Sequence, residues 1–176
     1  MEAAALIAQL QADFPEEILS ADPEAIDPWV EVRAKALPYV ARRLRDDDRY
    51  AFNFLHCISA VDYCEPDPKK AAKVEWEPHL EVLYHLSSMK HRHRIVLKVV
   101  LPRWKDNTPG RLPEVPSLTA IWPTAEWHER EVYDLSGVFF TNHPDLRRIL
   151  CPEDWVGHPL RKDYQMPEEY HGIRAR

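Results

Sequence analysis

The last quarter of the chain constrains the fold most, because it combines charge, aromatic rings and proline without a regular period. After Gly137 the apolar residues follow neither the 3.6-residue spacing of a helix nor the alternation of a strand. Such a segment buries little of its own surface. We therefore predict an α+β globular domain over residues 1–137 and an extended, proline-rich C-terminal arm over residues 138–176 that packs against another protein.

Length and composition support one soluble domain with an appendage. The chain has 176 residues, of which 45% are hydrophobic and 30% charged, an ordinary balance for a domain with a real core. It has 4 glycines against 16 prolines, which favours rigid connections and an ordered arm. A net charge of -6 argues against nucleic acid as a partner, because binding to phosphates needs a basic surface.

The sequence also argues against membrane insertion and bound clusters. No run approaches the roughly 18 to 20 apolar residues that span a bilayer. Glu2 stands where a signal peptide carries positive charge, so we expect a cytoplasmic chain. Cys57, Cys64 and Cys151 form no C-x-x-C pair, and we predict neither a disulfide nor a complete four-thiolate iron–sulfur site.

The first hundred residues alternate between helical and strand patterns. Apolar spacing predicts helices over residues 3–10 and 36–45, and alternation predicts a strand over 29–32. Residues 52–61 have apolar side chains at both odd and even positions, which predicts a strand buried on both faces. Residues 79–86 and 94–101 predict a hairpin, and residues 102–116 a loop. We therefore predict a mostly antiparallel sheet flanked by helices.

The best-specified local element is a helix between Thr124 and Gly137. Thr124 is a candidate N-cap, and Gly137 can end the helix in a left-handed conformation. Glu126, Arg130 and Asp134 are spaced at i, i+4 and i+8, so we expect Arg130 to bridge both acids. One interpretation is a solvated salt-bridge face. The other is a partner interface, since the arm that follows is rich in Arg, Trp and Tyr, residue types enriched at binding hot spots.

Three ordered motifs in this region resemble a known family. They are Glu129-Arg130-Glu131-Val132-Tyr133-Asp134-Leu135, then residues 143–150 (HPDLRRIL), then residues 157–164 (GHPLRKDY). Together with residues 117–127 they are similar to the C subunit of the proton-pumping NADH:quinone oxidoreductase, respiratory complex I. The resemblance covers about residues 115–164. Ser136 departs from the family's usual aromatic and Gln165 from its usual proline, and Ser136 puts the packing at the helix end in question.

The resemblance implies a structural and assembly role in the peripheral arm of that complex. It implies no catalytic, cofactor-binding or metal residues in this chain, FMN and iron–sulfur clusters in partner subunits, and electron transfer from NADH to quinone. It also implies a hetero-oligomer with the D subunit, a separate polypeptide here, and with other peripheral-arm subunits on the cytoplasmic face of the membrane. We predict that the motifs supply the partner interface through Glu126, Glu129, Arg130, Glu131, Tyr133, Asp134, His143, Asp145, Arg147, Arg148, Trp155, His158, Arg161, Lys162, Asp163 and Tyr164.

Two other functions remain open from the residues. The same fold could serve a related membrane-bound hydrogenase or a ferredoxin-dependent quinone-reducing complex. A stand-alone metalloprotein could use the histidines at 79, 85, 91 and 93. His91 and His93 share one side of a strand, but no third ligand is nearby, so we interpret them as part of a solvated hairpin turn. Glu129 and Glu131 point about 200° apart on a helix, which argues against a catalytic carboxylate pair.

Overall fold

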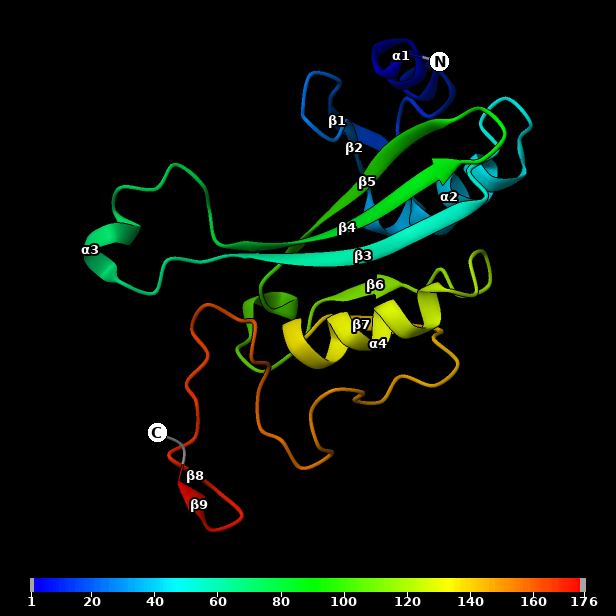
Figure 1. Ribbon diagram of the computed structural model, residues 1–176. Helices are drawn as coiled ribbons and strands as arrows, with labels where there is room; N and C mark the ends of the chain where they lie inside the picture. Colours follow the sequence, from blue (N-terminus) through cyan, green and yellow to red (C-terminus); the bar gives the residue numbers. More distant parts are fainter. Residues whose placement is uncertain (1, 175–176) are drawn as a thin grey trace.

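A computed structural model describes residues 2–174 and shows a five-stranded sheet with helices on one side (Figure 1). The strand order is β1-β2-β5-β4-β3. Only the β2–β5 pair is parallel, so the sheet is mostly antiparallel and the α+β prediction is confirmed. The strands are β1 (Ile18–Asp22), β2 (Trp29–Val32), β3 (Phe54–Tyr63), β4 (His79–Ser88) and β5 (His93–Pro102).

The helices and the hairpin of the first hundred residues form where the apolar spacing predicted them. Helix α1 spans Ala3–Asp13, and α2 spans Leu37–Asp46 after a 3-10 turn, η1 (Ala34–Ala36). Strands β4 and β5 pair from His79 with Pro102 to Ser88 with His93, which confirms the hairpin. The longer strands of the structure follow from this continuous pairing, because each added residue gains a cross-strand neighbour.

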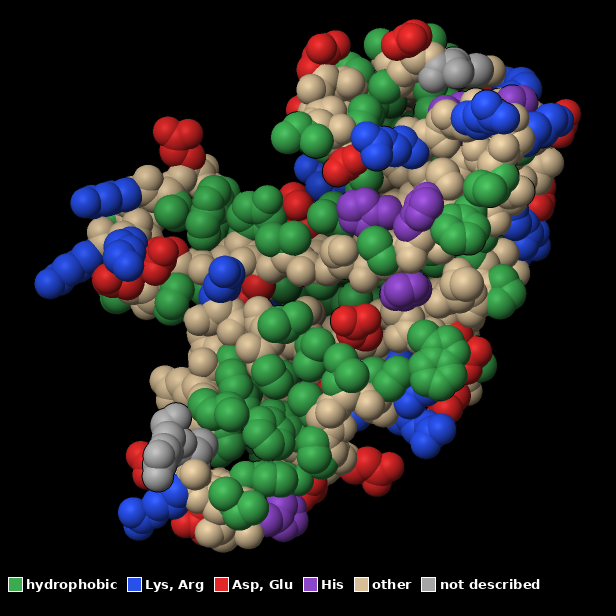
Figure 2. Space-filling view, viewed as in Figure 1, with side chains coloured by type: hydrophobic (Ala, Val, Ile, Leu, Met, Phe, Trp, Pro, Cys, Tyr) green, Lys and Arg blue, Asp and Glu red, His purple; other side chains and the backbone are tan. Residues whose placement is uncertain are grey.

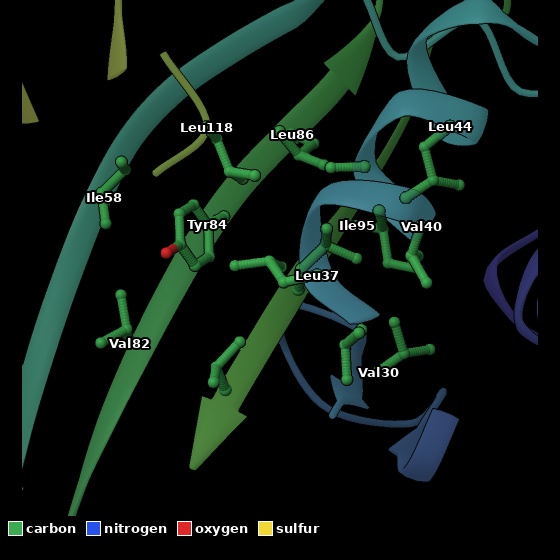
Figure 3. Close-up of a cluster of buried hydrophobic side chains, with 14 of the residues drawn as sticks. Val30, Leu37, Val40, Leu44, Ile58, Val82, Tyr84, Leu86, Ile95 and Leu118 are labelled. Carbon is green, nitrogen blue, oxygen red and sulfur yellow. The ribbon is translucent and has the colours of Figure 1, made fainter. Parts of the chain in front are cut away.

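The core lies between α2 and the inner face of the sheet (Figure 3). Leu37, Val40 and Leu44 of α2 face strand residues such as Val82 and Leu86. Each fully buried aliphatic or aromatic side chain contributes about 1.5–3 kcal/mol relative to exposure. Among the described residues, this cluster includes none after Leu146.

Strand β3 differs from its prediction, which was wrong about burial on both faces. β3 is an edge strand that pairs only with β4, and its outer residues face away from the helices. Phe54 is 46% exposed, whereas Leu55 and Ile58 are buried against the core. The apolar run hid the true alternation because a register shift between Leu55 and Cys57 moves the inward-facing position by one residue.

The second half of the chain forms a smaller layer beside β3. Helix α4 (Ala125–Ser136) packs against β3. Beneath it β6 (Glu114–Pro116) and β7 (Phe139–Thr141) form a parallel pair that the sequence did not predict. The remaining elements are short: α3 (Pro68–Ala71), the 3-10 turn η2 (Lys105–Asn107), β8 (Glu169–Tyr170) and β9 (Ile173–Arg174).

Between β7 and β8 the chain runs as coil that returns over α4 before it reaches the C-terminal end (Figure 1). The expectation that this coil buries little of its own surface overlooked its contacts with α4, which are polar and are made with buried charges. Within residues 2–174 no helix combines the length and apolar content required to cross a bilayer.

Candidate functional site

The candidate site is the layer formed by α4 and the coil that lies on it. The α4 helix begins without a side-chain cap: Thr124 has helical φ and ψ of -61° and -22° and makes no capping hydrogen bond, so the predicted N-cap is wrong. The backbone N–H of Ala125 donates instead to the carbonyl of Trp122 at 2.9 Å. The N–H of Glu126, which an N-cap side chain can accept, donates to the carbonyl of Pro123 at 3.2 Å, so backbone carbonyls of this turn take the place of the Thr124 side chain.

The helix ends at Gly137, as predicted. Gly137 has a φ of 69° in the left-handed region, and its N–H donates to the carbonyl of Tyr133. A Cβ at this position would lie 2.5 Å from Cδ2 of His158. Glycine is thus required twice, by the backbone conformation and by the imidazole that packs on it.

Arg130 does not bridge Glu126 and Asp134, and that prediction was wrong. Its Nε donates to the carbonyl of Arg147 at 3.2 Å, and its Nη2 donates to the carbonyl of Arg148 at 3.1 Å. The returning coil lies over this face of α4 and presents carbonyl oxygens to the guanidinium. Arg130 is therefore buried and fixes the backbone of the coil rather than the surface of the helix.

Asp134 anchors the same coil from the other side. Its Oδ2 accepts backbone N–H groups of Ile149, Leu150 and Cys151 at 3.0, 2.7 and 2.8 Å, and its Oδ1 accepts Nη1 of Arg148 at 2.5 Å. Burial alone raises the pKa of this carboxyl, but the hydrogen bonds from Cys151, Arg148 and their neighbours lower the pKa to about 2. Asp134 is fully buried and ionised.

Arg148 connects Asp134 to the next turn of the coil. It donates to the main-chain carbonyl of Asp134 at 3.1 Å and to the carbonyls of Trp155 and Gly157, both at 2.9 Å. One planar guanidinium therefore links its own segment of the coil to α4 and to the turn at residues 155–157, a geometry that lysine cannot reproduce. We call Arg130, Asp134, Arg148 and Arg161 the clamp.

Arg161 completes the clamp at the C-terminal end of α4. Its guanidinium donates to the carbonyls of Ser136 at 2.6 Å and Gly137 at 3.0 Å, and to that of Arg103 at 3.0 Å. It lies over the Trp104 ring, 4.5 Å from the centroid. A cation at this position satisfies unpaired carbonyls and interacts favourably with the helix dipole.

An ion-pair network ties the end of the coil to the edge of the sheet. Arg103 donates to Asp62 on β3 through two bonds of 2.8 Å and to Asp163 at 2.7 and 3.1 Å. The backbone N–H of Lys162 donates to Asp62 at 2.9 Å. Sequence reasoning missed Asp62, Arg103 and Trp104. The available signal was a carboxylate at an inward-facing position of β3, where an apolar residue is expected.

Glu129 is also buried, but inside the body. Its Oε1 accepts the backbone N–H of Leu118 at 2.7 Å, while Oε2 has no partner within the described residues. Burial raises the pKa of Glu129 to about 7, against the lowering effect of hydrogen bonds from Leu118 and Ser117. Glu131 lies on the exposed side of α4, so the two carboxyls face apart as predicted.

The predicted interface residues thus divide into two groups. The clamp residues and Glu129 lie within the chain, where they act on its own backbone. The others are exposed or half-buried on α4 and the coil: Glu126, Glu131, Tyr133, His143, Asp145, Arg147, Trp155, His158, Lys162, Asp163 and Tyr164. His143 and His158 contact carbonyls of α4, at Glu126 (3.0 Å) and Asp134 (2.9 Å).

The histidines of the hairpin region form no metal site among the described residues. The interpretation of His93 as part of a solvated turn was wrong: it is buried, stacks on Phe52 and contacts the carbonyl of Tyr50 through Nε2 at 2.9 Å. Its position at the start of β5 turns it toward the core. His91 contacts the carbonyl of Asp48 through Nε2 at 2.7 Å.

Comparison with known proteins identifies similar chains over nearly the whole length. The family model described as "Respiratory-chain NADH dehydrogenase, 30 Kd subunit" matches residues 30–170. The C subunit of NADH-quinone oxidoreductase from Roseiflexus castenholzii is 44% identical over 164 residues, which is 93% of this chain and 84% of that protein. The protein of the same name from Herpetosiphon aurantiacus is 37% identical, over 96% of this chain and 88% of the relative.

Two solved structures share the fold. A chain of the membrane-bound sulfane sulfur reductase, an archaeal respiratory membrane complex, superposes with a TM-score of 0.70 and 24% identity, over 94% of this chain and 87% of that chain. A trypsin-resistant fragment of Nqo5 superposes with a TM-score of 0.56 and 25% identity, over 83% of this chain and all of the fragment. The fold of this chain is thus shared with a chain of an archaeal respiratory membrane complex and with the Nqo5 fragment.

Proposed function

The chain belongs to the family of the 30 kDa subunit of respiratory-chain NADH dehydrogenase, and from this membership we propose its role in complex I. It is one of the peripheral-arm subunits of NADH-quinone oxidoreductase and works in a hetero-oligomer with the others. We propose that its contribution is structural. FMN and iron–sulfur clusters then lie in partner subunits, and this chain supports electron transfer from NADH to quinone without catalytic residues of its own.

We propose that the arm, residues 138–176, contacts the D subunit, with residues 1–137 as the supporting domain. One observation carries this proposal: the clamp fixes the backbone of the coil while apolar side chains of the coil face outward. Leu150, Val156 and Leu160 are 62%, 85% and 59% exposed. A fixed backbone that presents exposed apolar and basic side chains loses little entropy on binding, which favours a permanent partner.

We further propose that the assembled chain lies on the cytoplasmic face of the membrane and is held there through its partners. Among the alternatives, a stand-alone metalloprotein has no supporting side-chain cluster in the described residues. A related hydrogenase or ferredoxin-dependent complex would preserve the fold. The names of the curated relatives favour the NADH-quinone oxidoreductase.

Charge reversal on the outer side of the coil tests the proposed contact with the D subunit. Arg147 and Lys162 are exposed and lie outside the clamp, so Arg147→Glu with Lys162→Glu changes the surface and preserves the fold. Reversal of two interface charges is expected to weaken co-purification of the D subunit with the tagged chain about tenfold or more. The matched control is Lys69→Glu with Lys70→Glu on α3. Equal recovery of the D subunit with both pairs would refute the contact.

A further inference from the structure

A second feature lies far from the clamp, at the end of the β4–β5 hairpin. A hollow of about 770 Å³ opens between the hairpin and the start of α1. Side chains that line it include His56, Ser87, Met89, Arg92, His93 and Arg94. Its size is typical of a binding cleft, and nothing in the function of the clamp uses it.

The hollow is basic in an acidic chain. No carboxylate is among the described residues that line it, although the net charge of the chain is -6. Arg94 lies 3.7 Å from Asp27, a solvent-exposed pair, and Arg92 pairs with no carboxylate in residues 2–174. Exposed pairs of this length contribute little, so both guanidinium groups retain most of their capacity to bind an anion.

The hairpin end that carries these arginines is held in place. Arg92 has a φ of 55° in the left-handed region, and its N–H donates to the carbonyl of Ser88 at 2.8 Å. His91 and His93 contact backbone carbonyls of the neighbouring loop, at Asp48 and Tyr50. A non-glycine residue in this conformation is strained and persists only where its surroundings fix it. The buried His93 also has Nδ1 without a partner in the described chain.

The hollow continues onto the uncovered face of the sheet. Pro28, His56 and Arg94 also line a second hollow of about 210 Å³, together with Asp27, Cys57, His85 and Val96. Leu86 and Ile95 border it as well, but their side chains belong to the core. Figure 2 shows histidine side chains over this part of the surface and Lys and Arg side chains around the hairpin end. Basic groups thus adjoin an apolar floor formed by Pro28 and Val96, with the Asp27 carboxylate beside it.

We propose that this surface docks an acidic segment of another protein of the complex, with carboxylates on Arg92 and Arg94 and apolar side chains against Pro28 and Val96. The proposal rests on the chain's place in a multi-subunit complex. Charge complementarity selects the acidic character, and the apolar floor beside the arginines selects a polypeptide over a free ion. The Arg94 side chain is 71% exposed, so a small anion there would stay hydrated and its attraction to the guanidinium would be screened.

Site-specific cross-linking in the intact complex tests the proposal. A photoreactive residue in place of Met89, which is 69% exposed at the rim, is expected to capture a partner protein in the complex purified through a tag on this chain. Sequencing of the captured peptide is expected to show several Asp or Glu residues. Arg92→Glu with Arg94→Glu should reduce the cross-link about tenfold, and Arg92→Gln with Arg94→Gln should reduce it less. Lys69→Glu with Lys70→Glu should leave it unchanged.

Three outcomes overturn the proposal. They are a captured peptide without acidic residues, a cross-link unchanged by charge reversal in a chain whose thermal unfolding is normal, and no protein cross-link in a complex that still contains its partner subunits. Inorganic phosphate that binds the isolated chain and is lost with Arg92→Glu and Arg94→Glu, in the absence of any cross-link, would assign a small-anion site instead. A tagged chain that purifies without any partner protein refutes the proposed function as well.

Discussion

Glu129 is a buried residue whose charge depends on pH. In the unfolded chain its carboxyl titrates near pH 4.5, whereas burial raises its pKa in the folded protein to about 7. The folded state therefore keeps a proton that the unfolded state releases between these values. Its contribution to the free energy of unfolding is highest below pH 4.5, falls as the pH rises to about 7, and is constant above that.

Glu129→Gln should remove this pH dependence. Gln keeps an acceptor for the N–H of Leu118 without a charge, so the difference in unfolding free energy between the variant and the parent should grow by about 3 kcal/mol from pH 4.5 to pH 7. Urea denaturation at a series of pH values measures it. Glu131→Gln, on the exposed side of α4, is the control. A difference that does not change with pH would show that Glu129 ionises freely in the folded protein.

Asp134 depends on pH in the opposite sense. Its folded pKa of about 2 lies below the ordinary 3.8, so its stabilisation is complete above pH 3.8 and is lost as the pH falls toward 2. Asp134→Asn removes the charge that Arg148 and three backbone N–H groups surround. We expect a loss of about 3 kcal/mol in unfolding free energy at pH 7. Asp145→Asn breaks only the exposed pair with Arg147 and should cost much less. Equal costs in urea denaturation would contradict the clamp.

Residue spacing predicted which side chains share a face of α4 but not what they bind. The i, i+4 rule pairs Arg130 with its helical neighbours because it considers only the helix. The acceptors of Arg130 are the carbonyls of Arg147 and Arg148. They lie in a coil whose path cannot be predicted from hydrophobic periodicity. Burial of Arg130 and Asp134 therefore depends on long-range structure.

At the scale of elements, boundaries set by local chemistry were predictable. The αL end of α4 at Gly137 follows from glycine alone, and α2 follows from its apolar stripe. The β6–β7 pair was not predictable. Each strand has only three residues, and the paired residues Glu114 and Phe139 are 25 positions apart in the sequence. The burial of β3 was misjudged because a register shift is invisible in an apolar run.

Gly137→Ala tests the junction between α4 and the coil. Alanine at φ 69° is strained by about 1 kcal/mol, and its Cβ would collide with the imidazole of His158. Gly110→Ala is a matched control, since Gly110 has a φ of 87° and no heavy atom near a Cβ. We expect Gly137→Ala to lower the unfolding free energy by about 1 to 3 kcal/mol more than Gly110→Ala. Equal losses in denaturation would show that His158 moves away without cost.

In the whole molecule, the clamp and the Arg103 network make the coil part of the body. Asp62 on the edge strand reaches the coil through Arg103 and Lys162, and Arg161 joins the coil to the end of α4. The sheet, the helix and the coil are thus joined by charge-assisted hydrogen bonds. The motifs that resemble the family lie in this layer, and several of their charges act inside the chain.

Truncation after Thr141 separates folding of the body from assembly. The core residues of α1, α2 and the five strands all precede the cut, so the truncated chain should still fold cooperatively. It should also be less stable, because Asp134 would lose Arg148 and its three N–H donors, and the end of α4 would lose Arg161. Because the cut also removes the coil that buries Asp134, adding Asp134→Asn should cost the truncated chain little, in contrast to its cost in the intact chain.

If the arm carries the contact with the D subunit, neither truncated form should enter the complex, however well it folds. We expect native gels of membranes from such strains to lack the assembled complex. NADH:quinone activity should fall in proportion to the amount of complex, with an unchanged turnover in whatever complex remains. Circular dichroism and urea denaturation of the purified chains measure how well each truncated form folds. Normal assembly by a truncated chain would mean that the partner surface lies on the body, where the basic hollow at Arg92 and Arg94 would become the first candidate.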